Sequence, residues 1–136
     1  MDSNGLLQVR LGELRAGGLA PAVMAIVDRG VRQRPALAQS MNAEVELAFQ
    51  EAHPPVRIMF SDHSVLVEDG PASAPDLRID GSLGDQIALM VAPILGGLPS
   101  PISAQGRAAL GTVLSGRVRI SGSFGLLRRF LGVIHV

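Results

Sequence analysis

Apolar and polar residues alternate along four short segments in the middle of the chain. The alternating segments are residues 44–49, 56–60, 65–68 and 77–80. Because successive side chains of a strand point to opposite faces, each segment would place aliphatic residues on one face and charged residues on the other. Prolines, glycines and the pair Asp62 and His63 mark the turns between them. The pattern predicts consecutive strands of a sheet that is covered on one face only.

A helical spacing of apolar residues precedes these strands. Leu7, Leu11 and Leu14 would share one face of a helix near the N-terminus. A second helix is expected over residues 21–34, because proline favours a first helical turn and ends a helix that precedes it. A short helical turn is expected over 36–41. The region before the first strand is therefore predicted to be helical.

Helical spacing returns after the strands. Residues 83–94 carry apolar side chains at this spacing, and a glycine pair ends the run. Residues 98–115 are ambiguous: their prolines and Gly106 favour a loop, whereas 108–114 has the spacing of a helix.

The chain repeats one joint between a strand and a helix. Residues 77–84 and 118–125 both consist of a strand pattern, a glycine, a serine and the start of a helix. The glycine lets the chain turn, and Ser82 and Ser123 would cap the helices that follow. The second copy predicts a fifth strand over 117–121 and a last helix that begins near Ser123.

The composition removes several classes of function. The chain carries 12 basic and 12 acidic side chains, so no basic field attracts nucleic acid. Cysteine is absent, which excludes disulfides, thiol nucleophiles and cysteine metal sites. Aliphatic residues are abundant and aromatic residues make up only 3% of the chain, so the core must be built from aliphatic side chains. Such a core either packs tightly or encloses an apolar space.

No arrangement of residues indicates catalysis or metal binding. Asp62, His63 and Ser64 are adjacent and would point in different directions, which favours a turn over a catalytic triad. The three histidines lack metal-ligand spacing. The charged residues of the strands are expected to form exposed cross-strand ion pairs of ~0.2–1 kcal/mol each. Residues 122–125 have the features of a capped helix start rather than an anion site. We therefore expect no enzyme, no metal and no cofactor.

No targeting segment is expected. The first four residues are acidic and polar, unlike a signal peptide. The most apolar run, residues 87–98, is shorter than the ~20 residues of a membrane span. The C-terminal residues match no peroxisomal signal. The cytoplasm is the expected location.

The order of these elements resembles the sterol carrier protein 2 (SCP2) domain family. The resemblance covers residues 20–134 and is most specific at 116–122, where Gly-Arg-Val-Arg-Ile-Ser-Gly looks like the family's late G-[KR]-[LV]-x-[IV]-x-G strand. It implies a single lipid-binding domain over 1–136, with N-terminal helices in 1–41 and the sheet and further helices in 42–136. The implied α+β fold is a five-stranded one-sided sheet covered on one face by helices, with an apolar tunnel between them.

Two interpretations of the function stay open. The first is non-catalytic binding and transfer of a hydrophobic ligand, namely a lipid, sterol-like, fatty acyl or isoprenoid molecule, in the apolar space. The alternative is an accessory or scaffold subunit of a lipid or quinone biosynthetic enzyme, with a filled core and a protein partner. The sequence predicts which residues would line such a cavity but not which ligand would bind in it.

The candidate ligand-binding residues are apolar residues of the predicted strands and helices. They are Leu47, Phe49, Ile58, Phe60, Ile79, Ile87, Met90, Ile94, Leu98, Leu110, Leu114, Ile120, Leu127 and Leu131. The last helix and the loop at 96–106 would border the opening. Arg128 and Arg129 of that helix would contact an anionic membrane transiently, at ~1 kcal/mol each.

Overall fold

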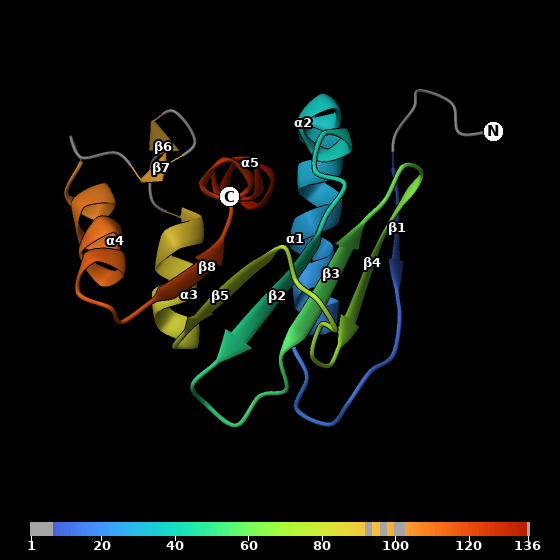
Figure 1. Cartoon of the computed structure of the whole chain (residues 1–136), viewed down its shortest axis with the longest axis horizontal. Coiled ribbons are helices and arrows are strands. Elements are labelled where there is room, and N and C mark those ends of the chain that lie inside the picture. Colours follow the sequence, from blue (N-terminus) through green and yellow to red (C-terminus); the bar gives the residue numbers. More distant parts are fainter. Residues whose placement is uncertain (1–6, 92–93, 96–97, 100–102, 136) are drawn as a thin grey trace.

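The computed structural model describes residues 7–91, 94–95, 98–99 and 103–135. A mixed six-stranded sheet forms one layer in the order β1-β4-β3-β2-β5-β8, and β6 and β7 form a separate hairpin (Figure 1). The strands are β1 (Gln8–Leu11), β2 (Glu44–Phe49), β3 (Val56–Phe60), β4 (Ser64–Asp69), β5 (Leu77–Gly81), β6 (Ile94–Leu95), β7 (Leu98–Pro99) and β8 (Arg119–Gly122). The helices are α1 (Ala20–Gln33), α2 (Pro35–Gln39), α3 (Leu83–Val91), α4 (Ala104–Leu114) and α5 (Phe124–Ile134).

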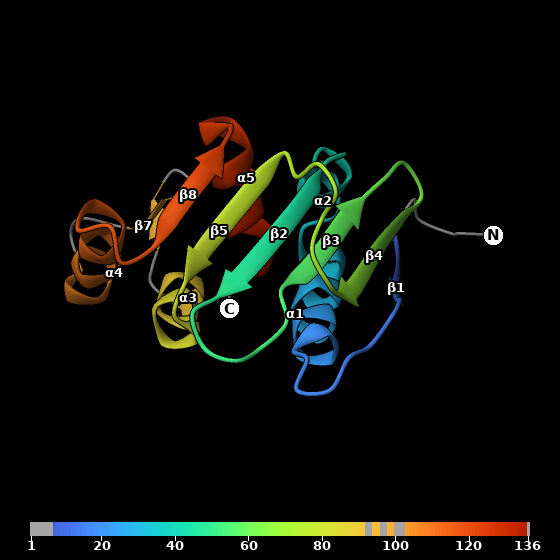
Figure 2. The same ribbon diagram turned by 60° about the horizontal axis from the view of Figure 1, so that its bottom comes forward.

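Helices cover one face of the sheet. Figure 2 shows α1, α2, α3 and α5 behind the strands, and both views place α4 beyond the β8 edge. The α+β class predicted from the sequence is confirmed. The sheet and the helices that pack on it bury one continuous aliphatic core.

The alternating segments form β2, β3, β4 and β5, as predicted. β2 lies between an antiparallel and a parallel neighbour: Val45 pairs with Ile58 of β3, and Leu47 pairs with Ile79 of β5. All four side chains are buried. Because side chains alternate between the faces of a strand, this register brings the apolar positions of neighbouring strands to the helix side.

The sheet has six strands instead of the predicted five, because the predicted first helix is wrong. Residues 8–11 form β1, which pairs in parallel with β4 and places Leu11 opposite Val67. An unpaired strand edge exposes backbone donors and acceptors, and β1 satisfies this edge of β4. The helical spacing of the leucines is coincidental, since Leu11 and Leu14 are both exposed and share no buried face.

The later helices start at the serines that the repeated joint predicts. Ser82 Oγ accepts a hydrogen bond from Asp85 N at 3.1 Å, and Ser123 Oγ accepts one from Leu126 N at 3.2 Å. These side-chain caps satisfy backbone donors that the first turn of a helix leaves free. The ambiguous segment resolves into β7 and α4, and Ser103 caps α4 in the same way.

Helices α1 and α5 meet at a glycine. A Cβ atom added at Gly30 of α1 would lie 1.9 Å from the carbonyl oxygen of Val133 in α5. The backbones of the two helices therefore approach as closely as a residue without a side chain permits. Within the described ranges, no helix combines the length and the apolar character that crossing a bilayer requires.

Candidate ligand-binding cavity

A cavity of about 410 Å³ lies between the sheet and three helices. Its floor is formed by β2 and β5, and its walls are formed by α1, α3 and α5. Pockets for small molecules typically measure ~300–1,000 Å³ and are mostly apolar. The described residues that line it are Leu19, Ala22, Val23, Ile26, Leu47, Phe49, Ile79, Leu83, Gln86, Ile87, Leu89, Met90, Leu131 and Ile134.

The floor follows from strand alternation. Leu47 and Phe49 are two residues apart on β2, and Ile79 of β5 is the register partner of Leu47. These three side chains therefore project from the same face of two adjacent strands. Phe49 also contacts His53 edge to face, with ring centroids 6.1 Å apart, which orients its ring at the end of β2.

The opening is marked by two exposed residues of the lining. Ile87 of α3 is 42% exposed, and Ala22 of α1 is exposed as well. A large aliphatic side chain that is this accessible and also lines a cavity is typical of a ligand-binding groove. The cavity therefore communicates with the surface between α1 and α3.

Gln86 is the one polar side chain among the described lining residues. It is 7% exposed, and its Nε2 donates hydrogen bonds to the carbonyl oxygens of Ala48 at 2.8 Å and Gly81 at 3.1 Å. These carbonyls belong to β2 and β5, so the amide joins α3 to the two strands of the floor. A buried amide must be hydrogen-bonded to offset its desolvation, and this one is.

The structure brings six of the residues proposed from the sequence together around the cavity. They are Leu47, Phe49, Ile79, Ile87, Met90 and Leu131. Their role in ligand binding stays a prediction, as does a tunnel through the fold.

Other proposed residues lie elsewhere. Ile58 and Phe60 are buried in the core that β3 shares with α1, and Leu127 and Ile120 also pack in this core. Leu110 is not part of the described lining, and Leu114 at the end of α4 is almost fully exposed. Ile94 and Leu98 belong to β6 and β7, whose side chains lie outside the described part of the structure.

Sequence reasoning missed the contribution of α1. Leu19, Val23 and Ile26 line the cavity, although the residues proposed from the sequence include none from 1–41. Their spacing of three and four residues already defined an apolar stripe on one helix face. The spacing alone could not tell whether the stripe faces packed side chains or a cavity.

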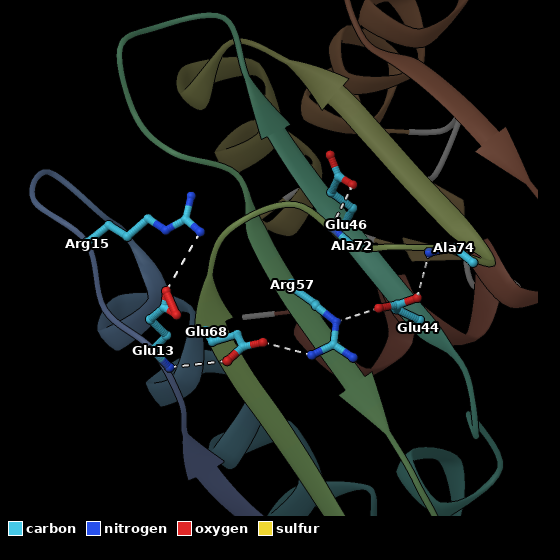
Figure 3. A network of polar contacts seen from close by, with 8 residues as sticks. All are labelled: Glu13, Arg15, Glu44, Glu46, Arg57, Glu68, Ala72 and Ala74. Carbon is cyan, nitrogen blue, oxygen red and sulfur yellow. Dashed lines mark hydrogen bonds and ion pairs between the residues drawn. The ribbon is translucent and has the colours of Figure 1, made fainter.

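The outer face of the sheet carries an ion-pair network (Figure 3). Arg57 donates from Nε to Glu44 Oε2 and from Nη1 to Glu68 Oε2, the latter at 2.8 Å. The hydrogen bond to Glu44 raises the pKa of Arg57, and the Glu68 carboxylate raises it further. Partial desolvation lowers the pKa but is outweighed by these two interactions. The pKa of Glu68 is lowered, first by the hydrogen bond from the backbone N–H of Glu13 and also by Arg57.

This face is not open, contrary to the prediction. Segment 70–76 crosses it, and the backbone N–H groups of Ala72 and Ala74 donate to Glu46 and Glu44 at 3.1 and 3.2 Å (Figure 3). Glu44 and Glu46 are consequently only 4% and 7% exposed. The interpretation as weak exposed ion pairs is therefore wrong for these two carboxylates, because the chain itself covers them.

The adjacent Asp62, His63 and Ser64 form the hairpin between β3 and β4. Ser61 N and Ser61 Oγ both donate to the carbonyl oxygen of Ser64, at 2.9 and 3.0 Å. Asp62 and His63 are exposed at the tip. In the part of the chain that the structure describes, no three histidine or carboxylate side chains gather where they could hold a metal ion.

The two arginines of α5 differ in their surroundings. Arg129 donates from Nη1 to the carbonyl oxygen of Ser40 at 2.7 Å and from Nε to that of Gly125 at 3.4 Å. This guanidinium therefore ties α5 to the residue that ends α2. Arg128 is exposed. Membrane contact by either arginine stays a prediction.

Comparison with known proteins defines the fold. No family model and no curated protein matches the sequence. Among solved structures, a protein described as "UbiJ-SCP2 Ubiquinone synthesis protein" superposes with a TM-score of 0.60 at 15% identity, over 86% of this chain and 88% of that one. The sterol carrier protein domain 2 of Helicoverpa armigera gives 0.57 at 13% identity, over 82% and 81%.

A third similar structure is that of palmitated SCP2L2 from Aedes aegypti. Its TM-score is 0.51 at 17% identity, over 84% of this chain and 91% of that one. Agreement over most of both chains defines an α+β fold of the sterol-carrier type. The chain therefore has an SCP2-like fold, which confirms the fold that the resemblance of its sequence implied.

Proposed function

We propose that this chain binds a hydrophobic small molecule in the cavity between α1, α3 and α5 and carries it without chemical change through the cytoplasm. The observation that carries the proposal is the lining, which is apolar at every described residue except Gln86. Such walls favour a ligand by removing its apolar surface from water, at roughly 25 cal/mol per Å².

The size of the cavity supports a ligand-binding role over a packing defect. Cavities in protein cores cost ~24 cal/mol per Å³. At that rate a closed void of about 410 Å³ would cost ~10 kcal/mol, which is comparable to the whole stability of a small domain. Access of water through the opening lowers this cost, and an apolar ligand lowers it further by restoring contacts to the walls.

Similar proteins indicate the class of ligand. One neighbour is named a sterol carrier protein and another was solved in a palmitated form. We extend to this chain the general property of holding a lipid, a sterol-like molecule, a fatty acyl chain or an isoprenoid.

The experiment is a search for co-purified lipid. The purified chain is extracted with organic solvent, and mass spectrometry of the extract is expected to show one lipid class at near one molecule per chain. Ala22 and Ala25 offer a matched pair of variants, because both are exposed on α1 and only Ala22 lines the cavity. Ala22→Trp should obstruct the opening and abolish co-purification, whereas Ala25→Trp should retain it. Lipid retained equally by both variants would contradict the proposal.

A second candidate is an accessory role in quinone biosynthesis. It is favoured by the likeness to the ubiquinone synthesis protein. Deletion of the gene in its host should then lower the quinone content, and the wild-type chain should restore it. Restoration by Ala22→Trp as well would favour the scaffold interpretation, because the scaffold needs no occupied cavity.

A further inference from the structure

The loop between β2 and β3, residues 50–55, is bonded to the starts of two helices. The Glu51 carboxylate accepts hydrogen bonds from the backbone N–H of Leu83, the first residue of α3, at 3.0 and 3.3 Å. His53 Nδ1 lies 2.9 Å from the carbonyl oxygen of Gly17 in the turn before α1. Because a carbonyl oxygen only accepts, Nδ1 is the donor. Both views show loop 50–55 at the end of the molecule where α1 and α3 begin (Figures 1 and 2).

These contacts lie beside the opening of the cavity. Leu83 lines the cavity, and Ile87, one turn further along α3, is exposed at the opening. On the opposite side, the exposed lining residue is Ala22 in the first turn of α1. Loop 50–55 therefore connects the two sides of the opening. The Glu51 and His53 side chains that make the connection are not among the described lining residues.

The α1 side of this connection is fixed to the sheet. Asp69 at the end of β4 is buried, and its carboxylate accepts hydrogen bonds from the backbone N–H groups of Arg15 at 2.9 Å and Ala20 at 3.1 Å. A Cβ added at Gly18 would lie 2.0 Å from Asp69 Oδ2, so the turn lies directly on this carboxylate. The carbonyl group of Gly17 that binds His53 therefore belongs to a firmly held turn.

The α3 side is less firmly packed. Among the described side chains of α3, only Gln86 and Leu89 are buried, and the helix packs on α4 and α5. Its first turns are bonded to the sheet and to loop 50–55 through the Gln86 amide and the Glu51 carboxylate. Segments that open locally have few buried apolar contacts. Helix α3 is therefore the side of the opening that moves more readily, and Glu51 ties it to the fixed side.

We propose that loop 50–55 limits the rate at which a ligand enters and leaves the cavity, because it ties α3 to the fixed turn before α1. This inference rests on the proposed function and concerns the regulation of the same cavity. Loss of the two hydrogen bonds leaves the described lining unchanged but makes the opening easier to widen. The rate constants for association and dissociation should therefore rise together, and their ratio, the dissociation constant, should stay nearly the same.

The test is stopped-flow fluorescence with the probe anilinonaphthalene sulfonate on the wild-type chain and on the double variant Glu51→Ala/His53→Ala. Since each hydrogen bond contributes modestly, we expect both rate constants to rise about tenfold, with a dissociation constant within about twofold of the wild type. Unchanged rate constants would overturn this inference and leave the proposed function standing. Faster dissociation without faster association would also overturn it, because the two residues would then stabilise the bound probe. A wild-type chain that does not bind the probe would count against the proposed function as well.

Two further double variants serve as controls. Asp62→Ala/His63→Ala removes a carboxylate and an imidazole from the exposed tip of the hairpin between β3 and β4, and should leave both rate constants unchanged. Glu51→Gln/His53→Asn keeps an acceptor and a donor at the two positions and should retain slow exchange. Fast exchange in this conservative variant would overturn the assignment to the hydrogen bonds. Should the double alanine variant fail to fold, Glu51→Ala alone decides by the same criterion, with an expected rise of about threefold.

Discussion

Replacing Gly30 by alanine tests how tightly the cavity-bearing helices are held together. The new Cβ would lie 1.9 Å from the carbonyl oxygen and 2.8 Å from the carbonyl carbon of Val133. Both atoms belong to the backbone of α5, so no rotation of a side chain can relieve the clash. Helices α1 and α5 would have to separate by roughly 1.5 Å to restore an ordinary contact.

Two opposing terms set the size of the effect. Overpacking in a core costs typically ~1–3 kcal/mol, and a contact with backbone belongs at the upper end of that range. Alanine gains back up to ~1 kcal/mol of helix propensity over glycine. We therefore expect Gly30→Ala to lower the free energy of unfolding by about 2 kcal/mol. Because Leu131 and Ile134 of α5 line the cavity, ligand binding should weaken as well.

The control is a glycine in a helix with open space around it. A Cβ at Gly111 of α4 would meet nothing within 4 Å, so Gly111→Ala should gain up to ~1 kcal/mol from helix propensity alone. Urea unfolding of both variants, followed by circular dichroism, measures the two changes. Opposite signs are expected. A Gly30→Ala variant as stable as the wild type would refute the reasoning about the contact between α1 and α5.

Three further predictions concern charged residues. The backbone N–H of Glu13 and the guanidinium of Arg57 lower the pKa of Glu68 below 4.5. The stability that the Glu68 carboxylate contributes is therefore present above pH 4.5 and is lost as the pH falls through the lowered pKa. In Glu68→Gln, the free energy of unfolding should fall less steeply as the pH is lowered through this range. Glu44→Ala should destabilise by about 2 kcal/mol in urea unfolding, because it removes charge-assisted hydrogen bonds to a buried carboxylate. Asp80→Asn, whose pair with Arg78 is more exposed, should cost less than ~1 kcal/mol. Arg128→Glu should reduce co-sedimentation with anionic vesicles at low salt, and equal binding of variant and wild type would exclude membrane contact through this residue.

The sheet was largely predictable because strand alternation is a local property. Apolar and polar residues alternate in each of β2 to β5, so that only one register buries all the apolar side chains. The glycine and serine at 122–123 located the last strand and the last helix. β1 was not predictable in this way. It is four residues long and mostly exposed, and its formation depends on the free edge of β4, which lies more than fifty residues away in the sequence.

The candidate site was predictable in character but not in detail. Scarce aromatic residues and abundant aliphatic ones left a tight core and an apolar space both open, and the family resemblance implied the space. The strand residues Leu47, Phe49 and Ile79 were identified by their period. Which helix residues face a cavity depends on how the helices pack on the sheet and on one another, and Gly30 contributes by allowing the close approach of α1 and α5. Gln86 escaped notice because its partners are backbone carbonyls, which a sequence does not display.

The glutamates on the outer face and the cavity floor on the inner face depend on the same strand. Alternation along β2 sends Glu44 and Glu46 outward, where segment 70–76 and two arginines bind them, and sends Leu47 inward to the cavity. A slip of one residue in the register would exchange the two sets and place carboxylates in an apolar space, where an unpaired charge costs several kcal/mol or more. The ion pairs of Glu44 and Glu46 on the outer face and the apolar side chains on the inner face therefore favour the same register of the strand on which the cavity is built.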